Sequence, residues 1–188
     1  MGLTVLIVVV AIIAVVVIAL VVMYNGLVRA RLRVDEAWSQ IDVQLKRRHD
    51  LIPNLVNAVR GYMDFEQATL TTVTNARAAA VSAGAQGPAA AAAAENVLTG
   101  ALRSLFAVVE NYPELKANEN VLALQEELTT TENRISFARQ HYNATTRDYN
   151  TAIATFPNAL LAGQFGFTAR DFFEAEPGAE AVPEVRLR

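Results

Sequence analysis

The chain opens with an unbroken run of apolar residues. Between Leu3 and Met23 the only polar side chain is Thr4, and the first charged side chain of the whole chain is Arg29. A helix of this length rises roughly 31 Å, enough to cross a bilayer core of about 30 Å. Despite the many Val and Ile residues, a helix is favoured there because it pairs its own backbone groups in hydrocarbon. The pattern predicts a transmembrane helix over residues 1–24.

A cleaved signal peptide is the alternative interpretation of this run. It would show a basic first region, roughly 7–15 apolar residues and a small-residue cleavage site. Residues 1–2 contain no Lys or Arg, the apolar run is longer, and Tyr24-Asn25-Gly26 follows it. Gly2 does not begin a myristoylation motif either, because position 6 is Leu. We therefore expect the helix to be retained as an anchor.

The charges that flank the run predict its orientation. Arg29, Arg31 and Arg33 follow it closely, and nothing basic except the α-amino group precedes it. Because basic flanks stay on the cytoplasmic side, we expect the N-terminus outside and the rest of the chain in the cytoplasm. The same arginines can meet anionic headgroups, which makes membrane lipid an expected partner.

Helical periodicity resumes directly after the span. The spacing predicts a continuous helix to about Asp50, in which Gly26 is either a hinge or, as we favour, a tolerated glycine. The predicted stripe consists of Val34, Trp38, Ile41 and Leu45.

Pro53 predicts the next boundary. Proline disfavours helix in the residue before it and suits the first turn of a new helix, which Asp50 is placed to cap. That second helix is expected to end near Val81, before a loop over residues 82–88. Its apolar positions are Leu55, Val59, Met63, Leu70 and Val73.

Two further helices complete the predicted bundle. A run of six alanines, Ala89 to Ala94, leads into a third helix that ends at Asn111-Tyr112-Pro113. Its apolar positions, at heptad spacing, are Leu98, Leu102, Leu105 and Val109. The fourth runs from about Glu114 or Asn118 to Thr155, and its seam alternates spacings of four and three, as in a left-handed coiled coil. That seam is Leu124, Leu128, Thr131, Ile135, Ala138, Tyr142, Thr145 and Tyr149. Whether it is filled within one chain or between chains stays open.

The predicted fold class is therefore all-α: an N-terminal transmembrane helix continues into an antiparallel bundle of three to four long helices over residues 25–157. Beyond it, residues 158–174 form a segment rich in Phe and Gly, which we expect to pack over one end of the bundle or dock on a neighbour. Residues 175–188, with Pro and Gly among Glu and Ala, are typical of a flexible tail.

No pattern in the chain predicts catalysis, a cofactor or a metal. Metalloprotease, nucleophile-elbow, P-loop, dinucleotide and EF-hand motifs are all missing, and no Glu-x-x-His is present for a di-iron bundle. We therefore assign no catalytic, cofactor-binding or metal-ligating residue and expect a protein that is not an enzyme. The net charge of −3 implies no general affinity for nucleic acid, and the lack of cysteine fits either side of a membrane.

Individual polar residues have ordinary structural interpretations. His49 is expected to meet helix carbonyls or solvent near a helix end, and His141 to lie at the bundle edge. The acidic pairs Glu126-Glu127 and Asp35-Glu36 are expected to be solvated, or to pair with arginines on adjoining helices or within their own helix. Thr131 and Thr145 either permit close helix approach or control register, and Trp38 favours core packing over a ligand platform.

Several of these stretches closely resemble the LemA family. The resemblance lies in Val34-Asp35-Glu36-Ala37-Trp38, in Gln44 to Val56, and in Asn118-Glu119-Asn120 with Leu124 to Leu128 and Thr131-Glu132-Asn133. Phe156-Pro157-Asn158 and Phe165-Gly166-Phe167 with Phe172-Phe173 complete it, so that it covers roughly residues 1–174. The alanine-rich stretch falls where length varies, and Thr168 stands where a basic residue is expected.

The resemblance implies a bacterial inner-membrane protein with a cytoplasmic antiparallel bundle, and membrane organisation rather than catalysis. Two functions follow. The first is a membrane-anchored scaffold that forms a homo-oligomer, and the alternative is a tethered adaptor that recruits a cytoplasmic partner protein through the bundle surface or the Phe-rich segment.

Overall fold

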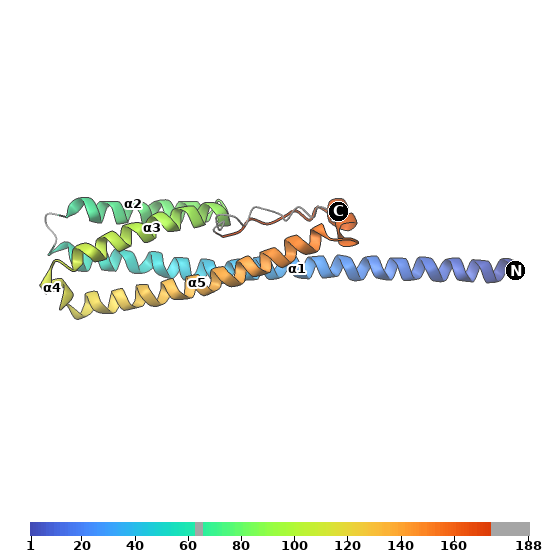
Figure 1. Cartoon of the computed structure of the whole chain (residues 1–188), viewed down its shortest axis with the longest axis horizontal. Coiled ribbons are helices and arrows are strands. Elements are labelled where there is room, and N and C mark those ends of the chain that lie inside the picture. Colours follow the sequence, from blue (N-terminus) through green and yellow to red (C-terminus); the bar gives the residue numbers. More distant parts are fainter. Residues whose placement is uncertain (63–65, 174–188) are drawn as a thin grey trace, which may run out of the picture. The chain divides into compact units, whose positions relative to one another are not determined.

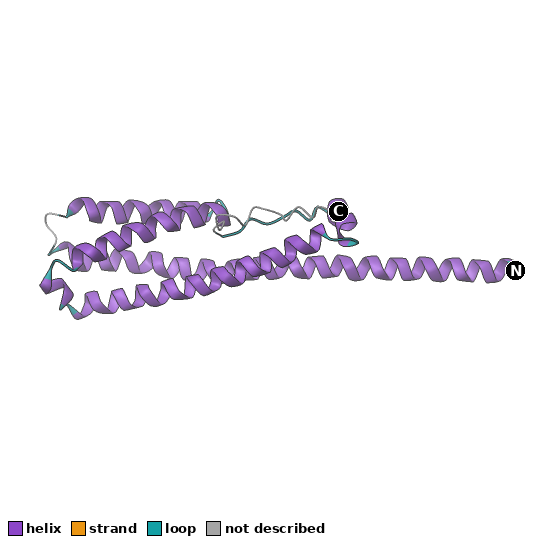
Figure 2. Cartoon of the chain, in the orientation of Figure 1, coloured by secondary structure: helices purple, strands orange, loops and turns teal. Residues whose placement is uncertain are grey.

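The computed structural model describes residues 1–62 and 66–173, and the regular structure in these residues is entirely helical (Figure 2). They form two compact units, one of residues 1–37 and 144–170, the other of residues 38–143 with the segment that begins at Asp171. The predicted tail, residues 175–188, lies outside the described residues, as does Met63. The helices are α1 (Gly2–Arg60), α2 (Gln67–Gly84), α3 (Pro88–Val109), α4 (Pro113–Lys116), α5 (Glu119–Ala154) and α6 (Asn158–Gln164).

The second unit is an antiparallel bundle of four helices, as the sequence predicted. Residues 38–60 of α1, all of α2 and α3, and residues 119–143 of α5 run in alternating directions (Figure 1). Each helix turns an apolar stripe inward, and burial of such stripes is the main stabilising term of a helix bundle. The largest side chains in this core with almost no exposure are Tyr142, Ile41, Ile52, Leu55, Leu98, Leu105, Leu115 and Val59.

Small residues line the contact between α2 and α3. Ala76 and Ala80 of α2 are buried, and so are Ala91 and Ala92 from the alanine run of α3. Side chains of this size let two helix backbones approach closely, so the low-complexity run is part of the core. Gly87, whose φ of 110° is one that L side chains rarely adopt, reverses the chain just before Pro88 opens α3.

Most of the predicted α5 seam is buried within the chain. Leu128, Thr131, Ile135, Tyr142 and Tyr149 are all buried, at the predicted spacing. Three seam positions, Leu124, Ala138 and Thr145, are half-buried, and Thr146 rather than Thr145 is the fully buried threonine. An α-helix has 3.6 residues per turn, so a buried face drifts by about 20° per heptad against a strict seven-residue repeat. After three heptads that drift moves the inward position by one residue.

The predicted break at Pro53 was wrong, because α1 continues through it to Arg60. Asp50 therefore lies inside a helix rather than capping one. Pro53 has no N–H to donate to the carbonyl of His49, four residues earlier. That carbonyl instead accepts a hydrogen bond of 2.6 Å from Nε of Arg77 in α2. The predicted second helix is thus divided between α1, which holds Leu55 and Val59, and α2.

The first unit holds the apolar beginning of α1. Within the described residues, α1 and α3 are both long and apolar enough to cross a membrane. In α3, Leu98, Leu102 and Leu105 are buried in the bundle, which identifies it as a core helix. The apolar run at the start of α1 is instead exposed, and the helix continues through Gly26 without interruption. The chain thus carries the N-terminal apolar helix of a membrane protein.

We predict that Arg77 and Pro53 are energetically coupled. Arg77→Met should lower the free energy of unfolding by about 1–3 kcal/mol, because the partly buried His49 carbonyl loses its donor. In a Pro53→Ala background the loss should shrink, since Ala has the N–H that proline lacks. Thermal unfolding of the four variants in mild detergent, followed by circular dichroism, measures the coupling. Arg60→Met, at an exposed position, is the control, and equal losses in both backgrounds would contradict the prediction.

Candidate functional site

A buried cluster of charged side chains lies inside the four-helix unit. Arg48 and His49 of α1 and Glu95 of α3 are only 4%, 8% and 4% exposed, although charged side chains are rarely buried to this degree. Glu132 of α5 reaches the cluster from a more exposed position. The cluster therefore joins three helices of the bundle in its interior.

Arg48 and Glu95 each bind more than one partner in this cluster. Nη1 of Arg48 lies 3.2 Å from Oε2 of Glu95 and 3.1 Å from Oε2 of Glu132. Nη2 of Arg48 donates to Oγ1 of Thr99 at 2.7 Å. The other carboxylate oxygen of Glu95, Oε1, lies 2.6 Å from Nε2 of His49. Both oxygens of Glu95 are thus engaged by α1, one by Arg48 and one by His49.

The prediction for His49 was therefore wrong. It was expected to meet helix carbonyls or solvent near a helix end, but Pro53 does not end α1, so His49 remains in the helix interior and faces α3. Glu95 was missed altogether. A signal for it exists in the sequence, because Glu95 shares the heptad-spaced face of Leu98, Leu102 and Leu105. A single carboxylate on an otherwise apolar stripe calls for a buried partner.

Such a cluster specifies alignment more than it adds stability. Removing two charges from water costs several kcal/mol per ion, which their mutual attraction repays only with good geometry. Removing one partner leaves an uncompensated charge, so slipping α3 along α1 by one turn would be penalised. We infer that the cluster holds the register of α1 against α3, a role the alanine-rich start of α3 cannot fill by itself.

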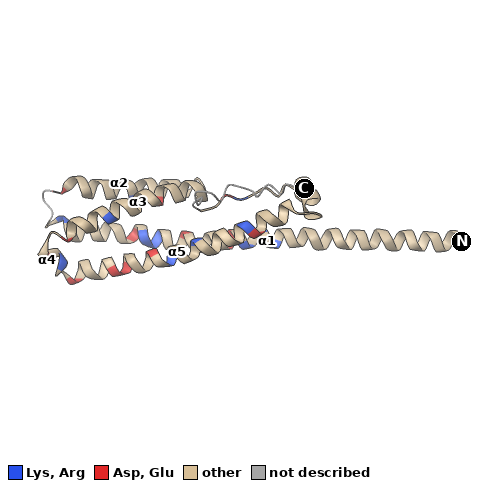
Figure 3. Ribbon diagram, in the orientation of Figure 1, with Lys and Arg blue, Asp and Glu red and all other residues tan. Residues whose placement is uncertain are grey.

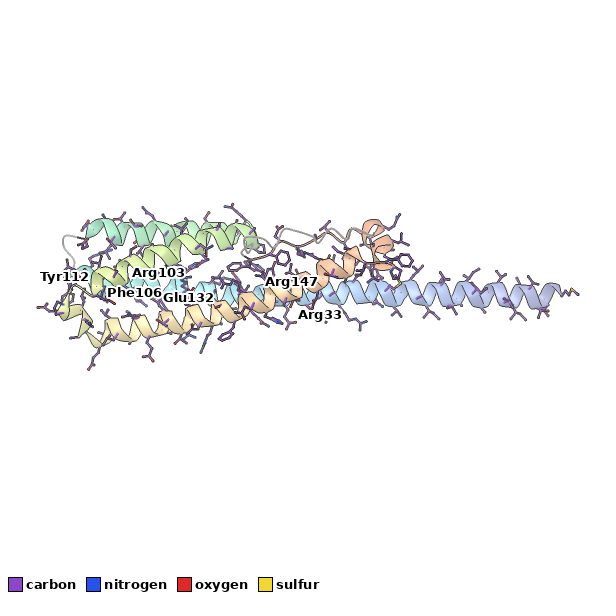
Figure 4. All side chains as sticks on the ribbon, in the orientation of Figure 1. Arg33, Arg103, Phe106, Tyr112, Glu132 and Arg147 are labelled. Atoms are coloured by element: carbon purple, nitrogen blue, oxygen red, sulfur yellow. The ribbon has the colours of Figure 1, made fainter. Side chains whose placement is uncertain are left out.

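A cavity of about 260 Å³ borders the cluster between α1, α3 and α5. Figure 4 shows Arg103, Phe106 and Glu132 on the two helices that flank it. Its walls also include Leu102, Leu128 and the polar groups of Arg48 and Thr99. The combination of apolar walls with an arginine at the edge suits one amphipathic side chain of a partner.

A second, larger groove of about 480 Å³ runs between α1 and α5. Its apolar walls are Val43, which is 60% exposed, and Phe137, which is 72% exposed. Oε1 of Gln44, at the same groove, is buried and has no hydrogen-bond partner among residues 1–62 and 66–173. His141 lies exposed at its edge, where the sequence placed it. The groove thus combines exposed apolar surface with an unsatisfied polar atom.

The other polar residues mostly follow their predicted roles. Glu127 pairs with Arg47 across helices at 2.6 Å, and Asp42 pairs with Lys46 one turn away in α1. Glu126 is exposed, and Asp35 pairs with Arg170 at 2.9 Å within the first unit.

Trp38 packs as predicted. Its ring lies 5.7 Å from that of Tyr142 and 5.8 Å from that of Phe173, measured between centroids. Thr131 is buried, and its hydroxyl donates to the carbonyl of Glu127 one turn earlier in α5. Because this bond satisfies the hydroxyl within α5, no neighbouring helix needs to supply a partner for it. Thr131 therefore serves close approach of the helices rather than control of their register.

Side chains of α5 hold the backbone of the Phe-rich segment. In the second unit, the Tyr142 hydroxyl donates to the carbonyl of Asp171 at 2.7 Å, and the Asn143 amide bonds both backbone groups of Phe173. In the first unit, the Tyr149 hydroxyl donates to the carbonyl of Thr168, and burial raises the pKa of this phenol. Phe167 and Phe173 are buried as a result.

The family model described as the LemA family matches residues 37–187, most of the chain. The chain belongs to the LemA family. Magnetosome protein MamQ of Magnetospirillum gryphiswaldense is 25% identical over 86% of this chain and 68% of its own length. Protein LemA of Metamycoplasma hominis is 27% identical over 80% of this chain and 68% of its own length. Family membership thus agrees with the resemblance seen in the sequence.

This LemA-family chain carries its distinctive polar chemistry inside the bundle. Among residues 1–62 and 66–173, no three His, Asp or Glu side chains are grouped so as to hold a metal ion. The buried polar groups around Arg48 are paired with one another, which suits an architectural part better than a binding centre. That no residue is catalytic or binds a cofactor stays a prediction of the sequence.

We predict that Glu95 is the most sensitive charged position of the bundle. Glu95→Gln should lower the free energy of unfolding by about 3–5 kcal/mol, because Arg48 loses its buried carboxylate partner and keeps only the half-exposed Glu132. Denaturant unfolding in mild detergent measures the loss. Glu126→Gln makes the same chemical change at an exposed position and should cost almost nothing. Equal effects of the two substitutions would show that the buried pair has no special role.

Proposed function

We propose that this protein is a membrane-anchored, non-enzymatic scaffold that self-associates at the bacterial inner membrane and organises membrane or envelope components there. The observation that carries the proposal is the groove between α1 and α5. Leu128, Ile135 and Tyr142 of the α5 seam are buried within one chain and are not available to a second copy. The groove is the exposed surface beside them, and the half-buried seam residue Ala138 forms part of its wall.

The groove offers what a protein interface needs. Single exposed apolar residues are ordinary on protein surfaces, but Phe137 and Val43 line one hollow together. Beside them, Oε1 of Gln44 is buried without a partner among the described residues, which costs about 1–3 kcal/mol. A neighbour that inserts an apolar side chain would cover Val43 and Phe137.

The membrane anchor makes a second copy the favoured neighbour. Chains held in one bilayer by the apolar start of α1 share a plane, which raises their effective concentration. A groove of modest size can then sustain lateral contacts that would be too weak in free solution. The names of the MamQ relatives associate them with the magnetosome, which supports a role in organising a membrane structure.

An adaptor function has one observation in its favour. The cavity beside Arg48, with Phe106 and Leu102 in its wall, could accept a side chain from a cytoplasmic partner instead. Under this alternative the protein would remain monomeric and Phe106, rather than Phe137, would decide what it binds.

We predict that Phe137→Glu abolishes higher assemblies of the full-length protein, because it places a charge in the apolar groove. Light scattering in mild detergent and cross-linking in membranes should both shift from oligomer to monomer. Val97→Glu changes a comparably exposed apolar residue of α3 and should leave the mass unchanged. A wild-type protein that is already monomeric in both measurements would overturn the scaffold and favour the adaptor.

We also predict that the N-terminus is outside and the bundle cytoplasmic, from the arginines that follow the span. The chain has no cysteine, so Gly2→Cys and Leu122→Cys each introduce a single thiol. A membrane-impermeant maleimide applied to spheroplasts should label the first and spare the second. Both should react once the membrane is permeabilised, and the reverse pattern would invert the topology.

A further inference from the structure

The first unit carries a second uncharged surface besides the span itself. From Tyr149 to Ala169 the chain contains no Asp, Glu, Lys or Arg, although this stretch includes the end of α5, all of α6 and the turns around it. In an exposed region of a cytoplasmic protein, so long a stretch without charge is unusual. On α1, the segment before Arg29 is likewise uncharged (Figure 3).

Large apolar side chains of this segment point away from the protein. Phe156 is 83% exposed, Leu160 is 68% exposed and Phe165 is 57% exposed. Leu160 lies on α6 and the two phenylalanines flank this helix, whose other side buries Leu161 and Ala162. The segment is therefore folded against the unit on one side and presents a phenylalanine and leucine surface on the other.

The position of this surface is given by its contacts with α1. The ring of Phe165 lies 5.1 Å from that of Tyr24, and the ring of Phe167 lies 5.7 Å from it, both edge-on. Tyr24 is the first residue after the apolar run, where aromatic side chains mark the boundary between hydrocarbon and water. The exposed surface around α6 is thus level with the end of the span.

Charged groups begin at one level on both helices. The ion pair of Asp35 and Arg170 joins α1 to the chain just beyond the uncharged stretch. Arg33 of α1 and Arg147 of α5 are exposed in the same unit (Figure 4), and Arg29 is exposed one turn nearer the span. The guanidinium of Arg31 stacks on the ring of Phe167 at 5.3 Å. This is the order expected at a membrane surface: apolar groups, then aromatic rings, then basic residues.

We propose that the segment from Phe156 to Phe165 is a second membrane contact, in which Phe156, Leu160 and Phe165 enter the interfacial layer of the bilayer that α1 spans. The occupant of this surface is lipid rather than a second protein, because the surface is continuous with the lipid-facing part of α1 and is bordered by arginines that suit anionic headgroups. The first unit would then rest on the membrane at two points.

The backbone of the following residues is held firmly enough to keep this surface in place. Asn150 of α5 donates to the carbonyl of Arg170 and accepts from its N–H, both at 2.9 Å. The Tyr149 hydroxyl also donates a hydrogen bond to the carbonyl of Thr168. Because α5 and α1 each anchor the segment, its contact with lipid would limit tilting of α1 at the membrane surface. The inference depends on insertion of α1 and not on self-association.

Single cysteines in the cysteine-free chain test the proposal. Leu160→Cys and Phe156→Cys, each labelled with an environment-sensitive fluorophore, should lose most of their emission when the full-length protein sits in nanodiscs whose lipids carry a shallow nitroxide quencher. Leu122→Cys, an exposed leucine on α5 in the other unit, should keep its emission. Circular dichroism of the labelled variants checks that the helices are retained.

The composition of the nanodiscs separates lipid from protein as the occupant. With one copy per disc, strong quenching at positions 156 and 160 supports the membrane contact. Emission equal to that of the Leu122→Cys control would overturn it. Fluorophores that are shielded from water only when several copies share a disc, and that the lipid quencher does not reach, would also overturn it. The Phe137→Glu substitution should leave the quenching unchanged, so this inference and the scaffold proposal fail independently.

Discussion

The four-helix unit depends on one short segment of α1, Arg48-His49, because every other helix of the bundle is attached there. The His49 carbonyl accepts from Arg77 of α2, and the two side chains share Glu95 of α3. Arg48 also reaches Glu132 of α5. Three partners converge on adjacent residues inside a low-dielectric core, where an unpaired group is costly. The arrangement of the bundle follows from satisfying all of them together.

This constraint also explains why α1 is a single long helix. A proline in a helix interior normally costs about 3 kcal/mol, partly because one carbonyl loses its donor. Here that carbonyl belongs to His49, and Arg77 supplies the missing donor. Leu51, Ile52, Leu55 and Val56 around Pro53 are buried, so breaking the helix would expose apolar surface worth more than the remaining strain.

The interior and the surface of the protein carry different information. In the interior, buried charged side chains are paired and most of the α5 seam is buried. Both features are those of a stable structural support. The surface features are a groove with Phe137 and an unpaired Gln44 oxygen, and, in the first unit, an uncharged apolar surface level with Tyr24. The second of these features, in the unit that holds the span, suits contact with a membrane, which agrees with a LemA-family protein whose N-terminal apolar run is exposed.

The sequence by itself determined the features that arise from local periodicity: an all-helical chain, the apolar span, the heptad face of α3 and most of the α5 seam. These follow from the repeat of a single helix, which is visible without knowing its neighbours. Only the tertiary structure decided whether Pro53 breaks a helix and which partners the side chains of His49 and Glu95 meet. The tertiary structure also decided which phenylalanines are covered: Phe167 and Phe173 are buried, whereas Phe156 and Phe165 are exposed. Each of these depends on a partner distant in sequence, and the free energy of burying a group is set by that partner.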